Sequence, residues 1–121
     1  DDPAPLADDP GLATVRHDLA DRATWAPSVG DATAMFLVRP PQVADARDVV
    51  NPFVDAGVAS GVRHVVFLSI QGGAKNRAVP HYAIERYLEA LARAGAATFT
   101  FLRAAFFFQN LSTTHRAEIR D

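Results

Sequence analysis

The sequence predicts an α/β fold in which a mostly parallel sheet is flanked by helices. Two observations carry this prediction. Short apolar runs alternate along the chain with segments of helical periodicity, which is the order of parallel strand–helix–strand units. The runs are continuously apolar, as is typical of strands buried on both faces. A chain of 121 residues is long enough for one domain with a core and too short for two.

The first third of the chain predicts two strands and a short helix. Residues 1–12 hold three Pro, one Gly and four Asp, so we expect them to be irregular. The run ATVRH at residues 13–17 is predicted to form a strand, and Asp21 is placed to cap a short helix after it. The run AMFLV at residues 34–38 is predicted to form the next strand, which the following RPP stops.

A helix is predicted over residues 43–57, where apolar and small residues recur at steps of three and four. Pro52 lacks the backbone N–H that a helix interior needs, so we expect it to kink or restart this helix. Asn51 is suited to cap the restarted part, and Gly61 to end it.

A second helix begins within the stretch VPHYAIERYL, at residues 79–88, and is expected to end at Gly95. Its apolar positions share one face, formed by Ile84, Tyr87, Leu88, Leu91 and Ala92. The opposite, solvent-facing side is expected to hold Glu85, Arg86, Glu89 and Arg93. The spacing of Glu89 and Arg93 favours an ion pair one turn apart.

Two further strands complete the pattern. The run HVVFLSI at residues 64–70 is the strongest strand signal, and the turn-rich QGGAKN follows it. The run TFTFL at residues 98–102 is predicted to be the last strand, followed by the aromatic segment AAFFFQN at residues 104–110.

Composition excludes several classes of function. A formal net charge of −2 provides no broad attraction to nucleic acid or anionic membranes. Without cysteine, the chain has no disulfide, thiolate metal site or cysteine nucleophile, and it is compatible with a reducing cytoplasm. The four His show no metal-binding spacing, so we expect no metal site. No apolar run approaches the roughly 20 residues of a membrane helix, and the acidic N-terminus is unlike a secretory signal.

Ligands of parallel α/β sheets bind at the carboxyl ends of the strands. The segments expected at this rim are HDL at 17–19, RPP at 39–41, SIQGG at 69–73 and AAFFFQN at 104–110. His81 and Tyr82 begin a helix that enters from the same edge. The candidate residues therefore lie on one rim.

Three residues of this rim have the spacing of a proton-transfer site. Ser69 ends a strand, Tyr82 follows thirteen positions later, and Arg86 lies one helical turn beyond. Short-chain reductases use such a layout, with Lys as the cation, to lower the pKa of a phenol that exchanges a proton with a carbonyl. Arg is not equivalent to Lys, and the alternative is that Tyr82 is a partly exposed residue of the first helical turn. His81 titrates near neutral pH and is either a proton donor or a helix-start residue bonded to a nearby loop.

Asp18 and the three phenylalanines at 106–108 also have two interpretations each. Asp18 could accept a hydrogen bond from an adenine amino group, or it could cap the turn that follows it. A phenylalanine in a loop at a strand end could wall an apolar pocket, although such a run is most often part of a core. Gly72 and Gly73 lack the spacing of a phosphate cradle and are expected to form a turn.

Residues 62–112 resemble the NmrA-like branch of the atypical short-chain dehydrogenases/reductases, in which quinone-reductase-like enzymes and NADP-sensing regulators occur. The resemblance is carried by the strand ending in Ser69, by PHYAIERYLEA at 80–90 and by TFTFLRAAFFFQN at 98–110, and it extends back through residues 13–41. It implies a Rossmann-like domain over residues 1–121 that binds NADP or NAD. The implied cofactor-binding residues are Asp18, Leu19, Val38, Arg39, Pro40, Ser69, Ile70, His81, Ala104, Ala105, Phe106 and Phe107.

Departures from the family pattern limit what the resemblance implies. A Lys that assists proton transfer in the reductase relatives is replaced by His81, and the common LRPGFF is LRAAFF at residues 102–107. The family begins with a strand, a glycine-rich turn and a helix, a unit of roughly 30 or more residues. No such glycine-rich run occurs here, so the Rossmann-like domain is expected to be incomplete at its N-terminus. In the family's sheet the two missing strands lie between the strands that correspond to residues 13–17 and 34–38, so their loss separates these two strands.

Two functions follow from these observations. The first is an NAD(P)H-dependent reductase acting on a quinone or related carbonyl compound, with His81, Tyr82 and Ser69 as catalytic residues. The second is a non-catalytic module that senses NADP(H) and regulates a partner. Unpaired strand edges also predict self-association with another copy of the chain.

Overall fold

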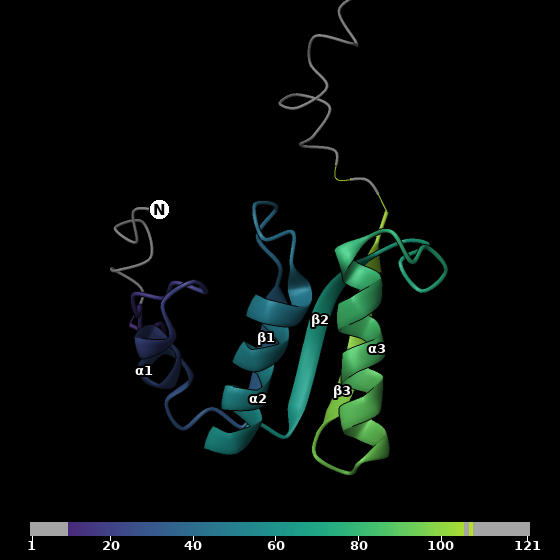
Figure 1. Cartoon of the computed structure of the whole chain (residues 1–121). Coiled ribbons are helices and arrows are strands. Elements are labelled where there is room, and N and C mark those ends of the chain that lie inside the picture. Colours follow the sequence, from purple (N-terminus) through teal and green to yellow (C-terminus); the bar gives the residue numbers. More distant parts are fainter. Residues whose placement is uncertain (1–9, 106, 108–121) are drawn as a thin grey trace, which may run out of the picture.

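A three-stranded parallel sheet forms the centre of the molecule (Figure 1). The structure, a computed structural model, describes residues 10–105 and 107. Strands β1 (Ala34–Val38), β2 (His64–Ile70) and β3 (Thr98–Ala104) lie in that order, and each pair is parallel. Helices flank the sheet, so the predicted α/β class with a parallel, partial Rossmann-like arrangement is confirmed.

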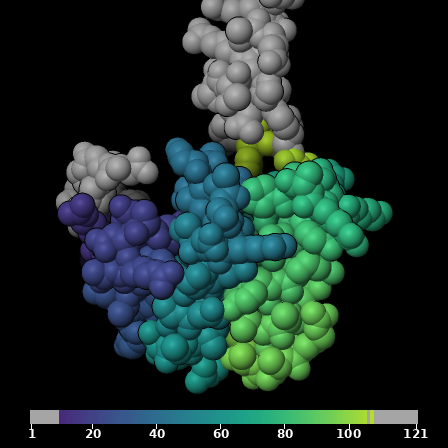
Figure 2. All heavy atoms as spheres, viewed as in Figure 1, coloured from purple at the N-terminus to yellow at the C-terminus, as the bar shows by residue number. Residues whose placement is uncertain are grey.

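The helices α2 (Asn51–Ser60) and α3 (Pro80–Arg93) lie on the same side of the sheet, and α1 (Trp25–Val29) packs beside α2 (Figure 1). In the space-filling view from that side, the residues of α2 and α3 abut (Figure 2). The core lies between these helices and the sheet. Its fully buried side chains include Phe67, Ile84, Leu88, Val50, Val54, Val62 and Val65.

The other face of the sheet is open, which differs from the prediction of strands buried on both faces. Alternate residues of β2 are buried toward the helices, while Phe36 and Val38 of β1 are 61% and 48% exposed. Leu102 of β3 is 46% exposed and lies in register with Val38 through Leu68. An apolar run alone does not distinguish one covered face from two.

The strand predicted at residues 13–17 is absent from the structure, and these residues are exposed and irregular. A strand needs a neighbouring backbone to accept its hydrogen bonds. A cavity lies between this segment and β1, which pairs with β2. Residues 13–17 therefore have the composition of a strand but do not form one, because no neighbouring strand of the described residues lies beside them to pair with.

The predicted short helix and its cap are confirmed. Asp21 Oδ1 accepts a hydrogen bond from the backbone N–H of Ala23 at 3.0 Å, at the start of a 3₁₀ turn over Arg22–Thr24 that continues into α1. The chain leaves α1 at Gly30, whose φ of +54° is strained for residues with a side chain.

Helix α2 accommodates Pro52 through a wider preceding turn that was not predicted from the sequence. A π-helical turn over Ala46–Val50 runs directly into α2, and the N–H of Asn51 bonds the carbonyl of Ala46. The wider turn precedes the position where Pro52 cannot donate. The cap is Asp45, whose side chain accepts from the N–H groups of Arg47 and Asp48, so the prediction that Asn51 caps a restarted helix is wrong. Gly61 ends α2 as predicted, with φ of +125°.

Helix α3 begins at Pro80, so His81 and Tyr82 occupy its first turn as predicted. Its buried face includes Ile84 and Leu88, and the left-handed Gly95 follows its end. Glu85 was assigned to the solvent face, but its side chain is fully buried. Glu89 pairs with Arg86 at 2.6 Å rather than with Arg93.

Candidate functional site

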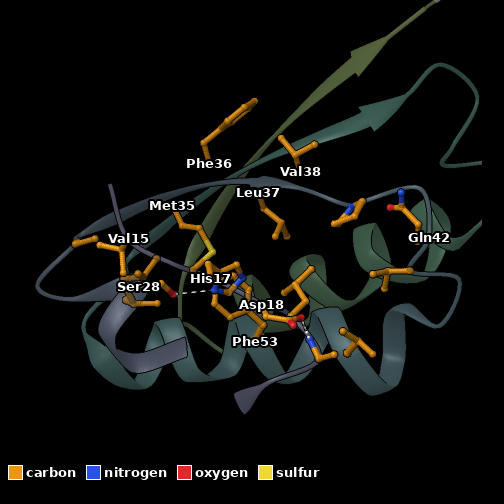
Figure 3. A pocket seen from close by; sticks show the side chains of 18 of the residues that line it. Val15, His17, Asp18, Ser28, Met35, Phe36, Leu37, Val38, Gln42 and Phe53 are labelled. Carbon is orange, nitrogen blue, oxygen red and sulfur yellow. Dashed lines mark hydrogen bonds between the residues drawn. The ribbon is translucent and has the colours of Figure 1, made fainter. Parts of the chain in front are cut away.

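A cavity of about 950 Å³ lies at the outer edge of β1, between that strand, residues 13–20, α1 and the start of α2 (Figure 3). Met35 and Leu37 point from β1 toward Phe53 and His17, whereas Phe36 and Val38 point to the opposite side (Figure 3). The lining residues are mainly apolar, with Asp18 and Asp45 among the few charged ones. Such a cavity suits a largely apolar or aromatic ligand group with few polar anchors.

Four of the predicted cofactor-binding residues meet at this cavity, namely Asp18, Leu19, Val38 and Pro40. They come from segments about twenty residues apart in the sequence, which the fold brings to one wall. The prediction that the ends of these two segments share a rim is consistent with this arrangement.

Asp18 is held rigidly at the cavity wall. Its Oδ1 accepts a hydrogen bond from the N–H of Ala20 at 2.8 Å, which is the predicted capping role. Its backbone N–H donates to the hydroxyl of Thr24 at 3.0 Å, and that hydroxyl donates to the carbonyl of Asp18. The turn therefore directs one oxygen of the exposed carboxylate toward the backbone N–H of Ala20.

His17 begins the HDL segment that was expected at the rim, although no role was predicted for its side chain. Its ring centroid lies 4.7 Å from that of Phe53, and its Nδ1 is 3.0 Å from the hydroxyl of Ser28. The ring and Phe53 together give the cavity an aromatic wall (Figure 3). The helical period marked Phe53 as apolar, but nothing in the sequence showed that His17 would lie against it.

Arg39 organises the turn after β1. Its Nη1 donates to the carbonyls of Pro40, Pro41 and Val43 at 2.9, 3.2 and 2.6 Å. These bonds close the loop that carries Val38 and Pro40 past the cavity. The positive charge of the guanidinium also acts on His81, in the first turn of α3, and lowers its pKa.

His81 is partly buried and stacks on a core residue. Its ring centroid is 5.8 Å from that of Phe67, and its Nδ1 is buried without a hydrogen-bond partner in the structure. Burial and the positive charge of Arg39 lower the pKa of His81 below its ordinary value, and the charge of Glu85 opposes this shift. Neither predicted role is settled by the contacts, but the unpaired nitrogen is not bonded to a loop backbone.

Ser69 and Glu85 form a buried network at the carboxyl end of β2. The Ser69 hydroxyl, 1% exposed, donates to Glu85 Oε1 at 2.6 Å. Arg103 of β3 binds the same carboxylate with two bonds, from Nε at 3.1 Å and Nη2 at 2.9 Å. Burial raises the pKa of Glu85, but hydrogen bonds from Arg103 and Ser69 outweigh it, so the pKa lies below its ordinary value. No functional role was predicted for Glu85 from the sequence.

The predicted trio of Ser69, Tyr82 and Arg86 is engaged in other contacts. The guanidinium carbon of Arg86 lies 5.5 Å from the ring centroid of Tyr82, so the cation faces the ring. Arg86 also pairs with Glu89 at 2.6 Å. With the Ser69 hydroxyl bonded to Glu85, each member has a structural partner.

The remaining predicted residues lie at or beyond the end of β3. Ala104 is in register with Ile70, and its carbonyl accepts from the N–H of Gln71 at 2.8 Å. Ala105 follows, and Phe107 is 50% exposed. Phe106 lies outside the described residues.

Within residues 10–105 and 107, no group of three His, Cys, Asp or Glu is placed to hold a metal ion. No helix among these described residues is long and apolar enough to cross a membrane. No family model matches the chain, and no curated protein was found to be similar to it.

Proposed function

We propose that this chain is part of a reductase-type domain that binds NADP(H) or NAD(H) and reduces a quinone or related carbonyl compound. The observation that carries the proposal is the cavity beside β1, at which Asp18, Leu19, Val38 and Pro40 meet. The cavity runs along the outer edge of β1 and reaches the carboxyl end of that strand at Val38 and Pro40, the end at which nucleotides bind in parallel sheets. The resemblance of residues 62–112 to the NmrA-like family supports the same conclusion.

In this proposal the adenine half of the cofactor occupies the cavity, with Asp18 accepting from the adenine amino group and His17 and Phe53 flanking the ring. Met35 and Leu37, which point into the cavity from β1, provide the apolar wall opposite together with Pro40 (Figure 3). The side chain of Val38 points to the other face of the sheet (Figure 3). Arg39, Ile70, His81, Ala104 and Ala105 are the residues that would hold the rest of the dinucleotide.

His81 is the better candidate for proton transfer, because the Ser69 hydroxyl is already bonded to Glu85 and Arg86 to Glu89. Its Nδ1 has no protein partner to lose, but it is buried, so a ligand atom would reach it only after the first turn of α3 shifts. A pKa below the ordinary value makes the imidazolium a stronger acid toward a carbonyl oxygen. Tyr82, one residue further along the first helical turn, would assist from the same rim.

Calorimetric titration of NADPH and of NADH into the purified chain tests binding. We expect affinity in the micromolar range, and a loss of about tenfold in Asp18→Ala. The matched control is Asp31→Ala, because Asp31 is exposed and does not line the cavity. A folded chain that gives no heat with either nucleotide would refute the proposal.

A specific observation also favours the second function, a non-catalytic NADP(H)-sensing module. Ser69 and Arg86, which would form a reductase site, are both tied to glutamates. NADPH oxidation measured against a panel of quinones separates the two functions. Binding without turnover, together with a partner interaction that changes with the NADP/NADPH ratio, would support the sensor.

Location and assembly are proposals of the same kind. A chain without cysteine and with a nucleotide site fits the cytoplasm. β1 and β3 are the outer strands of the described sheet. The outer edge of β1 borders the proposed cofactor cavity, so we expect pairing with a second copy at the edge of β3, or at β1 in competition with the cofactor. Light scattering over a range of concentrations tests this pairing, and a monomer at every concentration would exclude it.

A further inference from the structure

Glu85 lies where four segments of the rim converge. Its carboxylate accepts from Ser69 at the end of β2 and from Arg103 near the end of β3. The backbone of the loop after β2 packs directly against this pair. A Cβ on Gly73 would lie 3.1 Å from Ser69 Oγ and 3.4 Å from Glu85 Oε1. Glu85 itself is one helical turn after His81.

A fully buried carboxylate is a costly way to join these segments. Apolar residues of similar volume often give equal or greater stability than a buried ion pair, so stability alone does not explain Glu85. The charged carboxylate accepts hydrogen bonds whose direction is fixed by the donor. Arg103 binds both carboxylate oxygens, which fixes the orientation of the group as well as its distance.

The bonds of Glu85 fall next to the backbone groups of the proposed site. Ser69 precedes Ile70, whose carbonyl accepts from the N–H of Gly73 at 3.0 Å. Arg103 precedes Ala104, whose carbonyl accepts from Gln71 at 2.8 Å. One carboxylate therefore links the ends of β2 and β3, which already pair in the sheet, to the first turns of α3.

We propose that Glu85 is a positioning residue for the dinucleotide site: through Ser69 and Arg103 it holds the rim residues 69–73 and 104–105 and the helical turn that carries His81. This inference rests on the proposed function for its link to the cofactor. Glu85 touches no ligand in this scheme and acts through its two partners.

Glu85→Gln tests the inference, because it keeps the shape of the side chain and removes the charge that Arg103 binds. Glu89→Gln is the matched control, since Glu89 lies on the same helix and pairs with Arg86 near the surface. The first measurement is amide hydrogen exchange in the chain without ligand. Glu85→Gln should speed exchange at Gln71 and Gly73 by about tenfold while the amides of α2 keep their wild-type rates.

NADPH affinity is the second measurement. We expect Glu85→Gln to weaken it by about tenfold and Glu89→Gln to leave it unchanged. The double variant Glu85→Gln/Arg103→Gln should recover part of both losses, because two neutral partners can hydrogen-bond where a lone Arg103 cannot be matched. Such recovery would show that the two side chains act as a pair, and the exchange rates in α2 separate a local effect on the rim from a loss of overall stability.

The outcomes separate the two proposals. If wild type does not bind NADPH, the proposed function fails, and the exchange rates still decide whether Glu85 holds the rim. Unchanged exchange at Gln71 and Gly73 in Glu85→Gln would refute the positioning role. Uniformly faster exchange across α2 and the rim would refute it too, since Glu85 would then only stabilise the whole fold.

Discussion

The contact between Tyr87 and Asp55 gives a quantitative test of how α2 and α3 are joined. The Tyr87 hydroxyl donates to Asp55 Oδ1 across the two helices. Burial of the phenol, with the hydrogen bond and negative charge of Asp55, raises the pKa of Tyr87 to about 12 from an ordinary value of 10.0. The folded state therefore holds the phenol proton more tightly than the unfolded state does.

The sign follows from this difference. A group whose pKa is raised by folding contributes stability that is fully present below its unfolded pKa and is lost as pH rises through the folded value. The window runs from about pH 10 to about pH 12. Two pKa units correspond to roughly 2.7 kcal/mol at most, at about 1.36 kcal/mol per unit. Because Asp55 is exposed, solvent screening reduces the expected contribution to about 1 kcal/mol.

Tyr87→Phe should therefore lower the free energy of unfolding by about 1 kcal/mol at neutral pH. Urea unfolding can be followed by the fluorescence of Trp25, the only tryptophan, which is 5% exposed in the folded chain. Tyr82→Phe is the matched control, since Tyr82 is the chain's other tyrosine. In that variant, the ultraviolet absorbance of the phenolate reports Tyr87 alone.

Two results would contradict the reasoning. One is a phenolate that titrates near its ordinary value in folded Tyr82→Phe, which would mean that Asp55 does not hold the proton. The other is a Tyr87→Phe chain as stable as wild type at neutral pH, which would mean that solvent cancels the contact entirely.

Three further substitutions test other parts of the structure. Glu85→Ala should lower the free energy of unfolding, measured in urea, by about 2–4 kcal/mol. This is below the usual cost of breaking a buried ion pair because the partner Arg103 is 43% exposed. A loss under about 1 kcal/mol would contradict the burial of Glu85. Because folding lowers the pKa of His81, wild type should lose stability as pH falls from 6.5 toward the folded pKa. His81→Asn should remove that loss. The same pH profile of thermal unfolding in variant and wild type would count against the shift. Phe36→Lys, on the open face, should change stability by no more than about 0.5 kcal/mol and reduce any self-association seen by sedimentation; a large destabilisation would show that this face is covered.

The sequence predicted the regular elements well where periodicity and breakers agreed. The three strands of the sheet, the short helix capped by Asp21 and the ends at Gly61 and Gly95 are all observed. These features depend on local chemistry, since a glycine at positive φ or an Asp before a helix acts within a few residues.

Errors arose where the outcome depended on distant residues. Residues 13–17 have the composition of a strand, but whether they pair depends on what lies beside them, and here that is a cavity. Glu85 was placed on the solvent face because charge is the usual mark of that face. Its partner Arg103 is 18 residues away on a strand, so no helical period could identify the pair.

The candidate site was predicted in parts rather than as a whole. The parallel topology predicted that the ends of the strands would lie on one rim. The cavity does bring Asp18 together with Val38 and Pro40. The rule does not say which side chains a ligand can reach. His17 and Phe53 became a wall only through packing of the first segment on α2, which no local pattern encodes.

Ser69 shows how the structure changes the chemistry expected at a predicted position. Its single hydroxyl proton is donated to Glu85, and the side chain is 1% exposed, so a ligand at the rim does not meet this hydroxyl. What this part of β2 can offer a cofactor is backbone, whose placement depends on the strand end being held still. The carboxylate that occupies the hydroxyl is also the group that holds the end of β3. The role expected of Ser69 in proton transfer stays a prediction, and the contact that the structure shows for its hydroxyl is the bond to Glu85.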